Sequence, residues 1–459
     1  MKKLNRVMIA APKSGSGKTI FTLGLLSLLK KKADAPGQVV AFKSGPDYID
    51  PMFHRTVVGI PSENLDSFFD DEEGIRRILS RTTGSCGVME GVMGIYDGIN
   101  GSSGYDVATI TATPIILIID GKGIWNTITS LVKGLVLDDT NRLIRGVIIN
   151  RVSQKYYDTI GPLMDKMLAE IESPARSLGF VPDSKDLELT SRHLGLKLPW
   201  EIDNLKKQVE NFGELIEANC DMEAIYSIME AAPPIAVTDA TTGTTAADAT
   251  PLRLAVARDE AFCFYYNENM RTLRDAGIET VDFSPLHDEK LPEGISGILL
   301  GGGYPELYSE ALAKNETMRS SIRKVIENGM PSLAECGGFM YLLEAMETDG
   351  TKSEMVGAIP GSSRSTGKLS RFGYIQIQGQ KEGLLAAGEL IKGHEFHYFD
   401  SDNNGTDCIA RKPDGRGEWS CVHQGPDHFW GYPHLYYPSN PRFLTNFKNA
   451  MEEYLSKNG

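Results

Sequence analysis

Residues 7–19 read VMIAAPKSGSGKT, and this stretch decides how the first part of the chain folds. An apolar run comes first, a loop rich in glycine and serine follows, and Lys18 and Thr19 open a helix-like segment. A phosphate-binding loop has this order of strand, loop and helix, because loop N–H groups and the helix N-terminus then face the phosphate oxygens. The stretch therefore predicts a nucleotide-binding α/β domain.

The residue types of this loop match the chemistry of a nucleotide site. Gly15 and Gly17 let backbone N–H groups turn inward toward phosphate. Lys18 is expected to reach the β- and γ-phosphates, and the Thr19 hydroxyl is expected to bind Mg²⁺. These residues make ATP and Mg²⁺ the predicted ligands.

The loop departs from the common pattern at its start. Pro12 stands in place of the first glycine, and Lys13 stands where a variant class of these loops carries an additional lysine. The role of Lys13 is open. A glycine-rich turn without a ligand is the alternative interpretation, and the register of strand, loop and helix favours the nucleotide site.

Apolar runs alternate with helix-like segments through both halves of the chain. In the first half the runs cover residues 7–11, 39–42, 87–89, 115–120 and 146–150, and helix-like segments cover 18–31 and 125–137. In the second half the runs cover residues 252–257 and 297–300, and helix-like segments cover 267–276 and 340–345. Runs that are apolar throughout suit parallel strands buried on both faces, so each half is predicted to be a doubly wound α/β structure.

A Thr/Ala-rich tract without apolar periodicity separates the two halves. We expect a first domain at residues 1–232, a linker at 233–251 and a second domain at 252–459. A length of 459 residues agrees with two domains. A hydrophobic fraction of 41% and a charged fraction of 24% are typical of a globular protein and exclude a disordered chain.

Charge, hydropathy and cysteine usage exclude several classes of protein. A net charge of −14 argues against nonspecific nucleic-acid binding. The longest apolar run, at residues 114–119, is too short to cross a bilayer, and the N-terminal apolar stretch stops at Pro12. We therefore expect no signal peptide and a cytoplasmic location. Six scattered cysteines without a CxxC pair fit neither a disulfide framework nor a zinc ribbon.

Acidic residues follow two apolar runs, in loops rich in glycine and proline. Asp47 and Asp50 come after the second run, whereas Glu90 ends the third run and Asp97 follows it. Ligands of open α/β sheets bind at the carboxyl ends of the strands, where these acids are expected to converge. Taken singly, each acid also suits a solvated turn, but the joint pattern favours an Mg²⁺ and phosphate site.

The stretch SLAECGGF at residues 332–339 predicts a nucleophile on a strand-to-helix turn. Cys336 lies at the turn, where a helix N-terminus pushes a thiol toward thiolate. Ala334 replaces the glycine that is usual two residues before the nucleophile. The glycines at 301–303 follow a strand, and their backbone N–H groups are candidates to bind an oxyanion. Core packing is the alternative for a lone cysteine; the turn and the glycines together favour the nucleophile.

His434 is the histidine that we choose as the base for this nucleophile. It lies near the chain end within the alternating stretch GYPHLY at residues 431–436. The other histidines of the second half are His287, His394, His397, His423 and His428. The HEFH segment at 394–397 has only two residues between its histidines, so it is not the HExxH zinc motif.

Together these motifs resemble the cobyrinic acid a,c-diamide synthase family, whose members are glutamine-dependent, ATP-using amidases of corrinoid biosynthesis. The resemblance runs from residue 11 to about residue 438. Besides the phosphate loop and His434, its motifs are KSGPDYID at 43–50, NLD at 64–66, EGVMGIYDG at 90–98, RHLGL at 192–196, GGGYPE at 301–306, AECGG at 334–338 and GHEFHY at 393–398.

The resemblance implies an N-terminal P-loop domain like dethiobiotin synthetase, with a parallel sheet, and a C-terminal class I glutamine amidotransferase-like α/β domain. The site residues that it implies are Lys18 and Thr19 for ATP and Mg²⁺, Glu90 and Asp47 on the metal side, Asp50 and Asp97 for substrate positioning and phosphoryl transfer, and Asn150 for adenine. Many triad amidotransferases carry Glu two residues after the histidine, where this chain has Tyr436. Cys336 and His434 are therefore expected to act as a dyad with an open third member.

The implied reaction is ATP-dependent amidation of the a and c side-chain carboxylates of cobyrinic acid. Cys336 takes ammonia from L-glutamine, and the first domain activates the carboxylate as an acyl phosphate. Two active sites in one chain imply a sheltered path for ammonia, and a homodimer is the assembly considered. Because the acceptor is polyanionic, Lys43, Arg55 and Arg192 are candidates to offset the acidic charge of the chain.

Two alternatives to this reaction remain open from the residues. Nickel-sirohydrochlorin or hydrogenobyrinic acid is an alternative acceptor, because no residue pattern identifies the central metal. A nonenzymatic ATP switch is an alternative of another class, because related variant phosphate loops occur in partitioning ATPases. The switch explains the first half of the chain and leaves Cys336 and His434 without a role.

Overall fold

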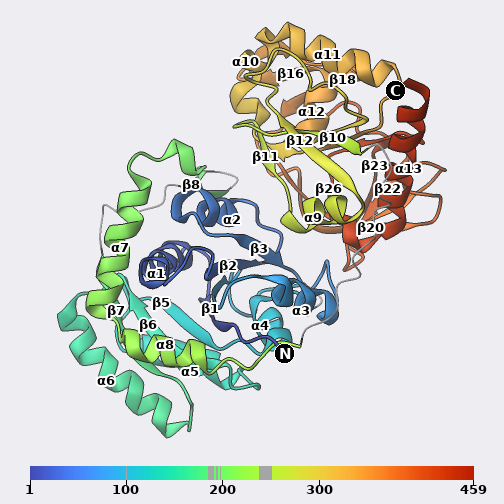
Figure 1. Ribbon diagram of the computed structural model, residues 1–459. Coiled ribbons are helices and arrows are strands. Elements are labelled where there is room, and N and C mark those ends of the chain that lie inside the picture. Colours follow the sequence, from blue (N-terminus) through green and yellow to red (C-terminus); the bar gives the residue numbers. More distant parts are fainter. Residues whose placement is uncertain (100, 184–190, 193–194, 197, 237–250, 459) are drawn as a thin grey trace. The chain divides into compact units, whose positions relative to one another are not determined.

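The computed structural model describes the chain except residues 100, 184–190, 193–194, 197, 237–250 and 459. The chain separates into two compact units, residues 1–240 and 241–459, each with its own central sheet (Figure 1). Most of the expected linker lies outside the described residues. Ile235, inside that linker, pairs with Lys2 by backbone hydrogen bonds of 2.8 Å in both directions, so the start of the expected linker is anchored to the first unit.

The first unit is built on a seven-stranded sheet in which every neighbouring pair is parallel, in the order β3-β2-β4-β1-β5-β6-β7. Its strands are β1 (Asn5–Ala10), β2 (Val39–Ser44), β3 (Ser62–Leu65), β4 (Cys86–Glu90), β5 (Ile115–Asp120), β6 (Ile144–Asn150) and β7 (Arg176–Val181). All five runs expected from the sequence are strands. The two strands that hydropathy missed, β3 and β7, are the edges of the sheet, where burial on one side only leaves a more polar sequence.

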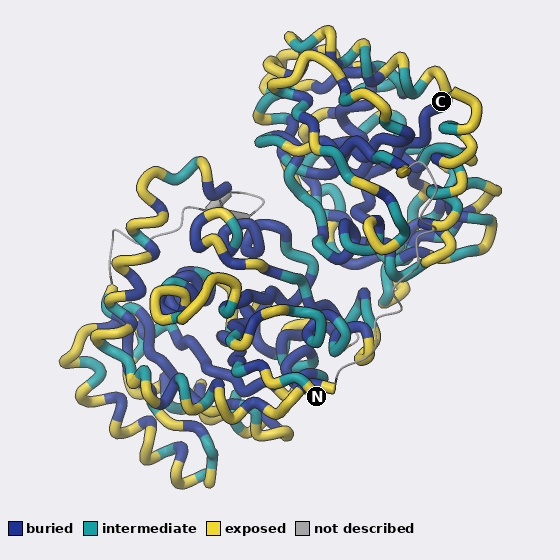
Figure 2. The backbone as a smooth tube through the Cα atoms, in the orientation of Figure 1, coloured by how far each residue is buried: buried dark blue, intermediate teal, exposed yellow. Residues whose placement is uncertain are grey.

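Helices cover both faces of this sheet. They are α1 (Lys18–Lys32), α2 (Ile49–Phe53) continued by a π-helix (His54–Val58), α3 (Glu72–Arg81), α4 (Gly104–Thr111), α5 (Thr127–Leu137), α6 (Gln154–Glu170), α7 (Leu205–Asn219) and α8 (Met222–Glu230). Apolar residues of α3, α4, α5 and α6 share one core cluster with the strands, while α1 packs against α7. Burial follows this layering, since the strands are dark in Figure 2 and exposed residues gather along outer helices such as α6. A short pair, β8 (Ser191–Arg192) and β9 (Gly195–Leu196), lies apart from the sheet.

The second unit has a six-stranded sheet in the order β12-β10-β13-β15-β25-β24. Its strands are β10 (Leu252–Ala257), β12 (Ile278–Phe283), β13 (Gly297–Leu300), β15 (Ser332–Glu335), β25 (His428–Gly431) and β24 (His423–Gln424). The first five are parallel and β24 is antiparallel. The helices of this unit are α9 (Asn267–Asp275), α10 (Ser309–Lys314), α11 (Glu316–Glu327), α12 (Gly337–Leu342) and α13 (Pro441–Asn458). The parallel core agrees with the expectation from the sequence.

Largely antiparallel structure accompanies that core and was not expected. It comprises β16 (Leu343–Thr348), β17 (Thr351–Glu354), β18 (Ile359–Ser365), β21 (Phe399–Ser401), β19 (Arg371–Gly379), β20 (Leu390–His397), β22 (Cys408–Arg411), β23 (Glu418–Cys421), β26 (His434–Leu435) and the small pair β11 (Phe262–Phe264) and β14 (Gly302–Gly303). The expected helix at 340–345 is wrong in its second half. It ends at Leu342 because residues 343–348 pair with β17 and β18.

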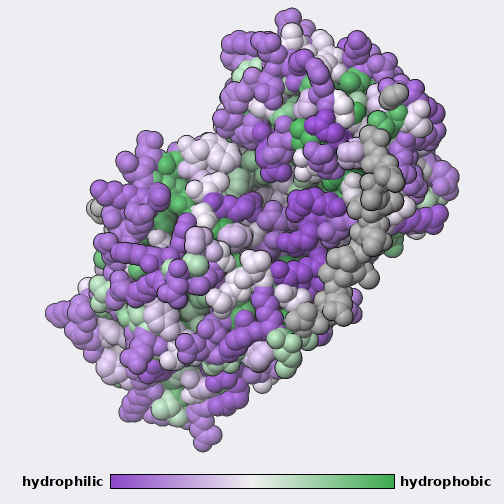
Figure 3. Space-filling view, in the orientation of Figure 1, coloured by the Kyte–Doolittle hydropathy of each residue, from purple (hydrophilic) through white to green (hydrophobic). Residues whose placement is uncertain are grey.

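The visible surface is mostly hydrophilic, with hydrophobic residues scattered over both units (Figure 3). None of the helices among the described residues combines the length and hydropathy needed to cross a membrane.

Candidate active sites

The phosphate loop joins β1 to α1 and has the backbone that its glycines allow. Gly15 and Gly17 have φ of 76° and 97°, in the left-handed region that side chains disfavour. A Cβ at position 17 would lie 2.2 Å from Nδ2 of Asn150. That nitrogen donates a 2.9 Å hydrogen bond to the carbonyl of Ser16, so the end of β6 supports the loop.

Lys18 turns its ammonium back over the loop. Nζ donates to the carbonyl of Met93 at 2.6 Å and to that of Lys13 at 3.2 Å. Burial, and secondarily the positive charge of Lys43, lower the pKa of Lys18 to about 8, although nearby carboxylates oppose the shift. A buried ammonium held only by neutral carbonyls gains most from an anion, which a phosphate group supplies.

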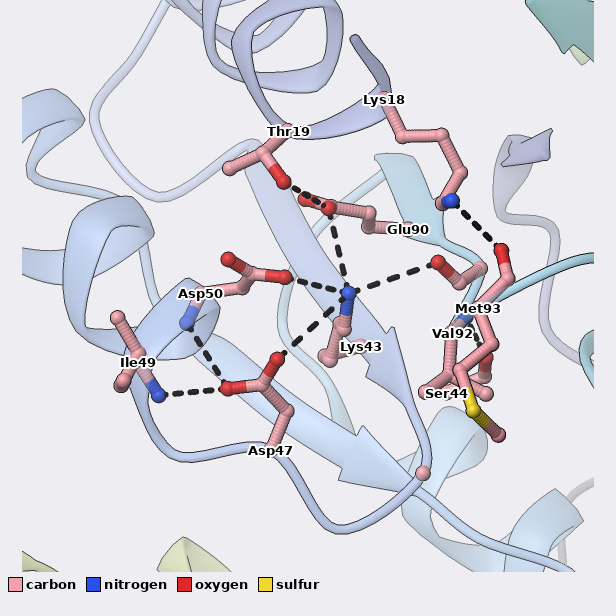
Figure 4. Close-up of polar contacts among 12 residues, drawn as sticks. Lys18, Thr19, Lys43, Ser44, Asp47, Ile49, Asp50, Glu90, Val92 and Met93 are labelled. Carbon is pink, nitrogen blue, oxygen red and sulfur yellow. Dashed lines mark hydrogen bonds and ion pairs between the residues drawn. The ribbon is translucent and has the colours of Figure 1, made fainter. Parts of the chain in front are cut away.

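Lys43, at the end of β2, is the centre of a cluster of acids (Figure 4). Its Nζ forms an ion pair with Asp50, lies 3.2 Å from Oε1 of Glu90 and lies 3.9 Å from Oδ2 of Asp47. The three carboxylates outweigh burial and raise the pKa of Lys43 above its usual value. Thr19 donates from Oγ1 to Oε1 of Glu90 at 2.6 Å, which joins the cluster to the phosphate loop.

This pairing corrects the role expected for Lys43. The side chain is buried and its positive charge is paired with carboxylates inside the site, so it is not available to offset an acidic acceptor. Arg55 is partly exposed and retains that candidacy, while the side chain of Arg192 lies outside the described residues.

The two most buried acids of the cluster have opposite pKa shifts. Burial, together with the charges of Asp47 and Glu90, raises the pKa of Asp50 well above its usual value, against the effect of Lys43. Burial also disfavours the charged form of Glu90, but Lys43, the nearby His54 ring and a hydrogen bond from Thr19 hold its pKa below the usual range. Of the two acids, Glu90 therefore favours the ionised form, and Asp50 gains a proton more readily.

Asp97 lies beside this cluster on the exposed loop after β4. Its Oδ2 accepts a 2.9 Å hydrogen bond from the backbone N–H of Gly94. Its charge is close enough to favour the ammonium form of Lys18. The acids that follow β2 and β4 thus lie together at the carboxyl ends of these parallel strands, where the sequence predicts them.

Two residues near the loop escaped the sequence analysis. Arg151 donates to the carbonyl of Gly15 at 3.1 Å and also bonds Asp120. His54 places Nε2 3.6 Å from Oε2 of Glu90, while its Nδ1 lies 2.9 Å from Oγ of Ser62. The position of Arg151 just after a buried strand could have indicated a residue of the nucleotide site. The position of His54 inside a helix gave no such indication.

The donor set suits Mg²⁺ that is shared with phosphate. Thr19 and Glu90 offer hard oxygen atoms, and Oε2 of Glu90 is buried without a hydrogen-bond partner. Among the described residues, no group of three or more His, Cys, Asp or Glu side chains is arranged to hold a metal alone. Mg²⁺ commonly takes one or two carboxylates and completes its shell with phosphate oxygens and water, which fits this arrangement.

In the second unit, Cys336 occupies the turn between β15 and α12. Its φ of 48° and ψ of −102° are strained for a residue with a side chain. Its N–H donates to the carbonyl of Gly431 at 2.9 Å, which extends the β15–β25 pairing and fixes the turn. Gly338 permits the close packing that follows, because a Cβ there would lie 2.1 Å from the carbonyl oxygen of Leu300.

The surroundings of Cys336 bear on two expectations about this site. Burial, together with the charges of Glu306 and Glu395, raises the pKa of the Cys336 thiol, which outweighs the N–H of Gly337 at the start of a six-residue helix. The resting group is a thiol, and it needs a base. The N–H of Gly301 donates to the Tyr265 hydroxyl at 2.9 Å, so this one of the three glycine N–H groups already has an acceptor, while Gly302 and Gly303 stay the oxyanion candidates.

His434 lies at the same end of the parallel strands as Cys336, because it follows β25 by only three residues. Its Nδ1 lies 3.9 Å from Oε2 of Glu335, the residue that precedes Cys336. The ring packs against Gly302, where a Cβ would lie 2.3 Å from Cε1. It also stacks on His394, with ring centroids 4.9 Å apart and planes at 17°. Burial, and then the two neighbouring histidines His394 and His397, lower the pKa of His434 well below its usual value.

The other histidines of this unit have structural partners. His287 is exposed and pairs with Glu260 at 2.8 Å. His428 bonds Asp427 at 2.7 Å and stacks on Trp430. His434 is thus the histidine that faces Glu335, the residue that precedes Cys336.

Comparison with known proteins assigns each unit and then the whole chain. Residues 7–196 match the CobQ/CobB/MinD/ParA nucleotide binding domain, and residues 253–435 match the CobB/CobQ-like glutamine amidotransferase domain. A protein of Listeria innocua named cobyrinate a,c-diamide synthase is 37% identical over 461 residues, which cover 97% of this chain and 99% of that protein. The chain belongs to the cobyrinate a,c-diamide synthase family.

Relatives in this family keep their similarity from end to end. Proteins of the same name from Clostridium tetani and Priestia megaterium are each 36% identical and cover 96% of this chain, with 99% and 96% of their own lengths. The family therefore combines the nucleotide-binding and amidotransferase domains in one chain, as the resemblance of the motifs implied. Membership makes this chain an ATP-dependent, glutamine-using amide ligase.

Proposed function

We propose that this chain amidates the a and c carboxylates of cobyrinic acid, with ATP and L-glutamine as co-substrates. The main supporting observation is that one chain, similar over its whole length to cobyrinate a,c-diamide synthases, holds two features. They are a phosphate loop with clustered acids, and a strained cysteine that follows a glutamate facing a histidine. The first feature suits activation of a carboxylate by ATP, and the second suits release of ammonia from glutamine.

In the proposed glutaminase step, Cys336 attacks the side-chain amide of glutamine. His434 takes the thiol proton and passes it to the departing nitrogen, so that ammonia is released. The glutamyl thioester that remains on Cys336 is then hydrolysed by water. The neutral imidazole supports this assignment, because its lowered pKa keeps it able to accept a proton near pH 7.

In the proposed synthetase step, the acceptor carboxylate attacks the γ-phosphate of ATP and forms an acyl phosphate, which ammonia converts to the amide. Lys18 and the loop N–H groups would orient the phosphates. Asp50 and Asp97 would position the acceptor and take part in phosphoryl transfer, and Asn150, which bonds the carbonyl of Ser16, would contact adenine. Thr19 and Glu90, with Asp47 nearby, would hold Mg²⁺, which supplies charge neutralisation of the phosphates when bound.

The proposal extends to domain limits, location and assembly. We assign the synthetase domain to residues 1–232, the linker to 233–251 and the amidotransferase domain to 252–459. The use of ATP and glutamine suits the cytoplasm. A homodimer stays a prediction.

The decisive experiment offers the purified chain three acceptors: cobyrinic acid, hydrogenobyrinic acid and nickel-sirohydrochlorin. With ATP, Mg²⁺ and glutamine present, we expect cobyrinic acid to gain two amides, read as the product mass. Preferred turnover of another acceptor would replace the substrate and leave the reaction class standing. ATP hydrolysis without glutaminase activity would favour the ATP switch and overturn the proposal.

A further inference from the structure

The carboxylate that commonly orients the histidine of a triad amidotransferase is absent from its usual place in this chain. Tyr436 stands there, two residues after His434. In the folded chain a different acid lies at that histidine. Glu335, at the end of β15, places Oε2 3.9 Å from Nδ1 of His434, and both side chains are buried.

Glu335 is fixed by the same segment that carries the histidine. Its Oε1 accepts a 2.9 Å hydrogen bond from the Tyr437 hydroxyl, and the backbone N–H of Leu435 also bonds the carboxyl group. Asn269 holds that segment from both ends, because Nδ2 donates to the carbonyl of Leu435 at 2.8 Å and Oδ1 accepts from the N–H of Tyr437 at 2.9 Å. Glu335 and His434 are thus locked to one short stretch of backbone.

We infer that Glu335 is the positioning residue of His434 and supplies from the strand the carboxylate that other triads carry after the histidine. The inference rests on the proposed glutaminase function. With Nδ1–H directed at Oε2 of Glu335, Nε2 is the nitrogen that takes the proton as the thiol S–H bond breaks and sulfur attacks the amide carbon. Nε2 then gives this proton to the departing ammonia, while Glu335 stays a carboxylate and offsets the imidazolium charge. A distance of 3.9 Å without substrate is compatible with this role, because catalytic hydrogen bonds often tighten on binding.

The surroundings of the pair predict how it titrates. Burial raises the pKa of Glu335 to about 8, against the hydrogen bonds from Tyr437 and Leu435. The titratable groups that face the pair and the thiol include Tyr265, Tyr432, Tyr437, His394, His397, Glu306 and Glu395. Because the active form needs the carboxylate, glutamine hydrolysis should rise with pH as Glu335 ionises.

The test is Glu335→Gln, which keeps the shape of the side chain and removes the charge. We expect kcat for glutamine hydrolysis to fall at least about 100-fold with KM within about threefold, and the rise with pH to disappear. Amide synthesis from added ammonia should stay unchanged. Glu310→Gln, which removes an exposed carboxylate on α10, is the matched control and should behave as the unmodified chain.

A second variant tests the inference if Glu335→Gln does not fold. Tyr437→Phe removes one hydrogen bond to Oε1 and should lower kcat by about three- to tenfold without changing KM. An unmodified chain without glutaminase activity would overturn both the proposed function and this inference. An active unmodified chain with Glu335→Gln within threefold of it, or equal loss of the ammonia-driven reaction in that variant, would overturn the inference alone.

Discussion

At the phosphate loop, three carboxylates surround the buried ammonium of Lys43, whereas beside Cys336 the buried carboxyl group of Glu335 faces His434. In the first site the charges are paired before any ligand arrives, and Glu90 stays ionised although it is fully buried. In the second site burial favours the neutral forms of the thiol, the imidazole and Glu335.

This difference follows from the chemistry that each site has to perform. A site for ATP and a metal binds ligands that are already charged, so fixed and compensated charges are useful. A site that splits a neutral amide creates its charges during the reaction, so the thiol and the imidazole can start neutral and exchange one proton, with the carboxylate of Glu335 offsetting the imidazolium once it is ionised. Three predictions test this comparison between the two sites.

The largest effect is expected at the nucleophile. Cys336→Ala should lower glutamine-driven amidation by at least about 10⁴-fold, because the thiol that forms the thioester in the proposed step is removed. Ammonia-driven amidation should continue, since the synthetase site is intact. Both rates are measured as amide product by mass. Loss of both activities in a folded variant would contradict the division of labour between the two units.

The next effect is expected at the buried lysine. Lys43→Met leaves Asp50 and Glu90 without their counterion, so we expect the first unit to lose about 3–5 kcal/mol of unfolding free energy. Hydrogen exchange in β2 and β4 under native conditions isolates this unit from the other. The exposed Lys133→Met on α5 is the control. A stability loss in Lys43→Met no larger than in this control would show that the cluster does not depend on compensation.

The smallest effect is expected from pH at Lys18. Its pKa of about 8 in the free protein means that the amine is neutral above pH 8 and has to take up a proton to pair with phosphate. ATP affinity should therefore be constant below pH 8 and fall by up to about tenfold per pH unit above it. Calorimetry in buffers of different ionisation enthalpy measures both affinity and proton uptake. Lys18→Arg should remove the dependence; a flat profile in the unmodified chain would refute the depressed pKa.

Much of both sites could be predicted from short stretches of sequence. The turn at Cys336 and the loop around Gly15 and Gly17 depend on a strand, small residues and a helix start that are contiguous in the chain. The parallel core strands were readable for the same reason, since burial on both faces leaves an apolar run. Edge strands such as β3 and the strands after Leu342 were not, because their sequences mix polar and apolar residues.

The sequence by itself determined two α/β units, a phosphate loop and a nucleophile turn, because glycine conformations and apolar runs act over a few neighbouring residues. Which polar and charged groups lie in contact depends on the tertiary structure. Lys43 and Glu90 are 47 residues apart, and Glu335 and Tyr437 are 102 residues apart. The pairing of β2 with β4, and of β15 with β25, brings these groups together and buries them. Burial magnifies each electrostatic interaction, so strand pairing, which no local pattern specifies, decides the protonation states of both sites.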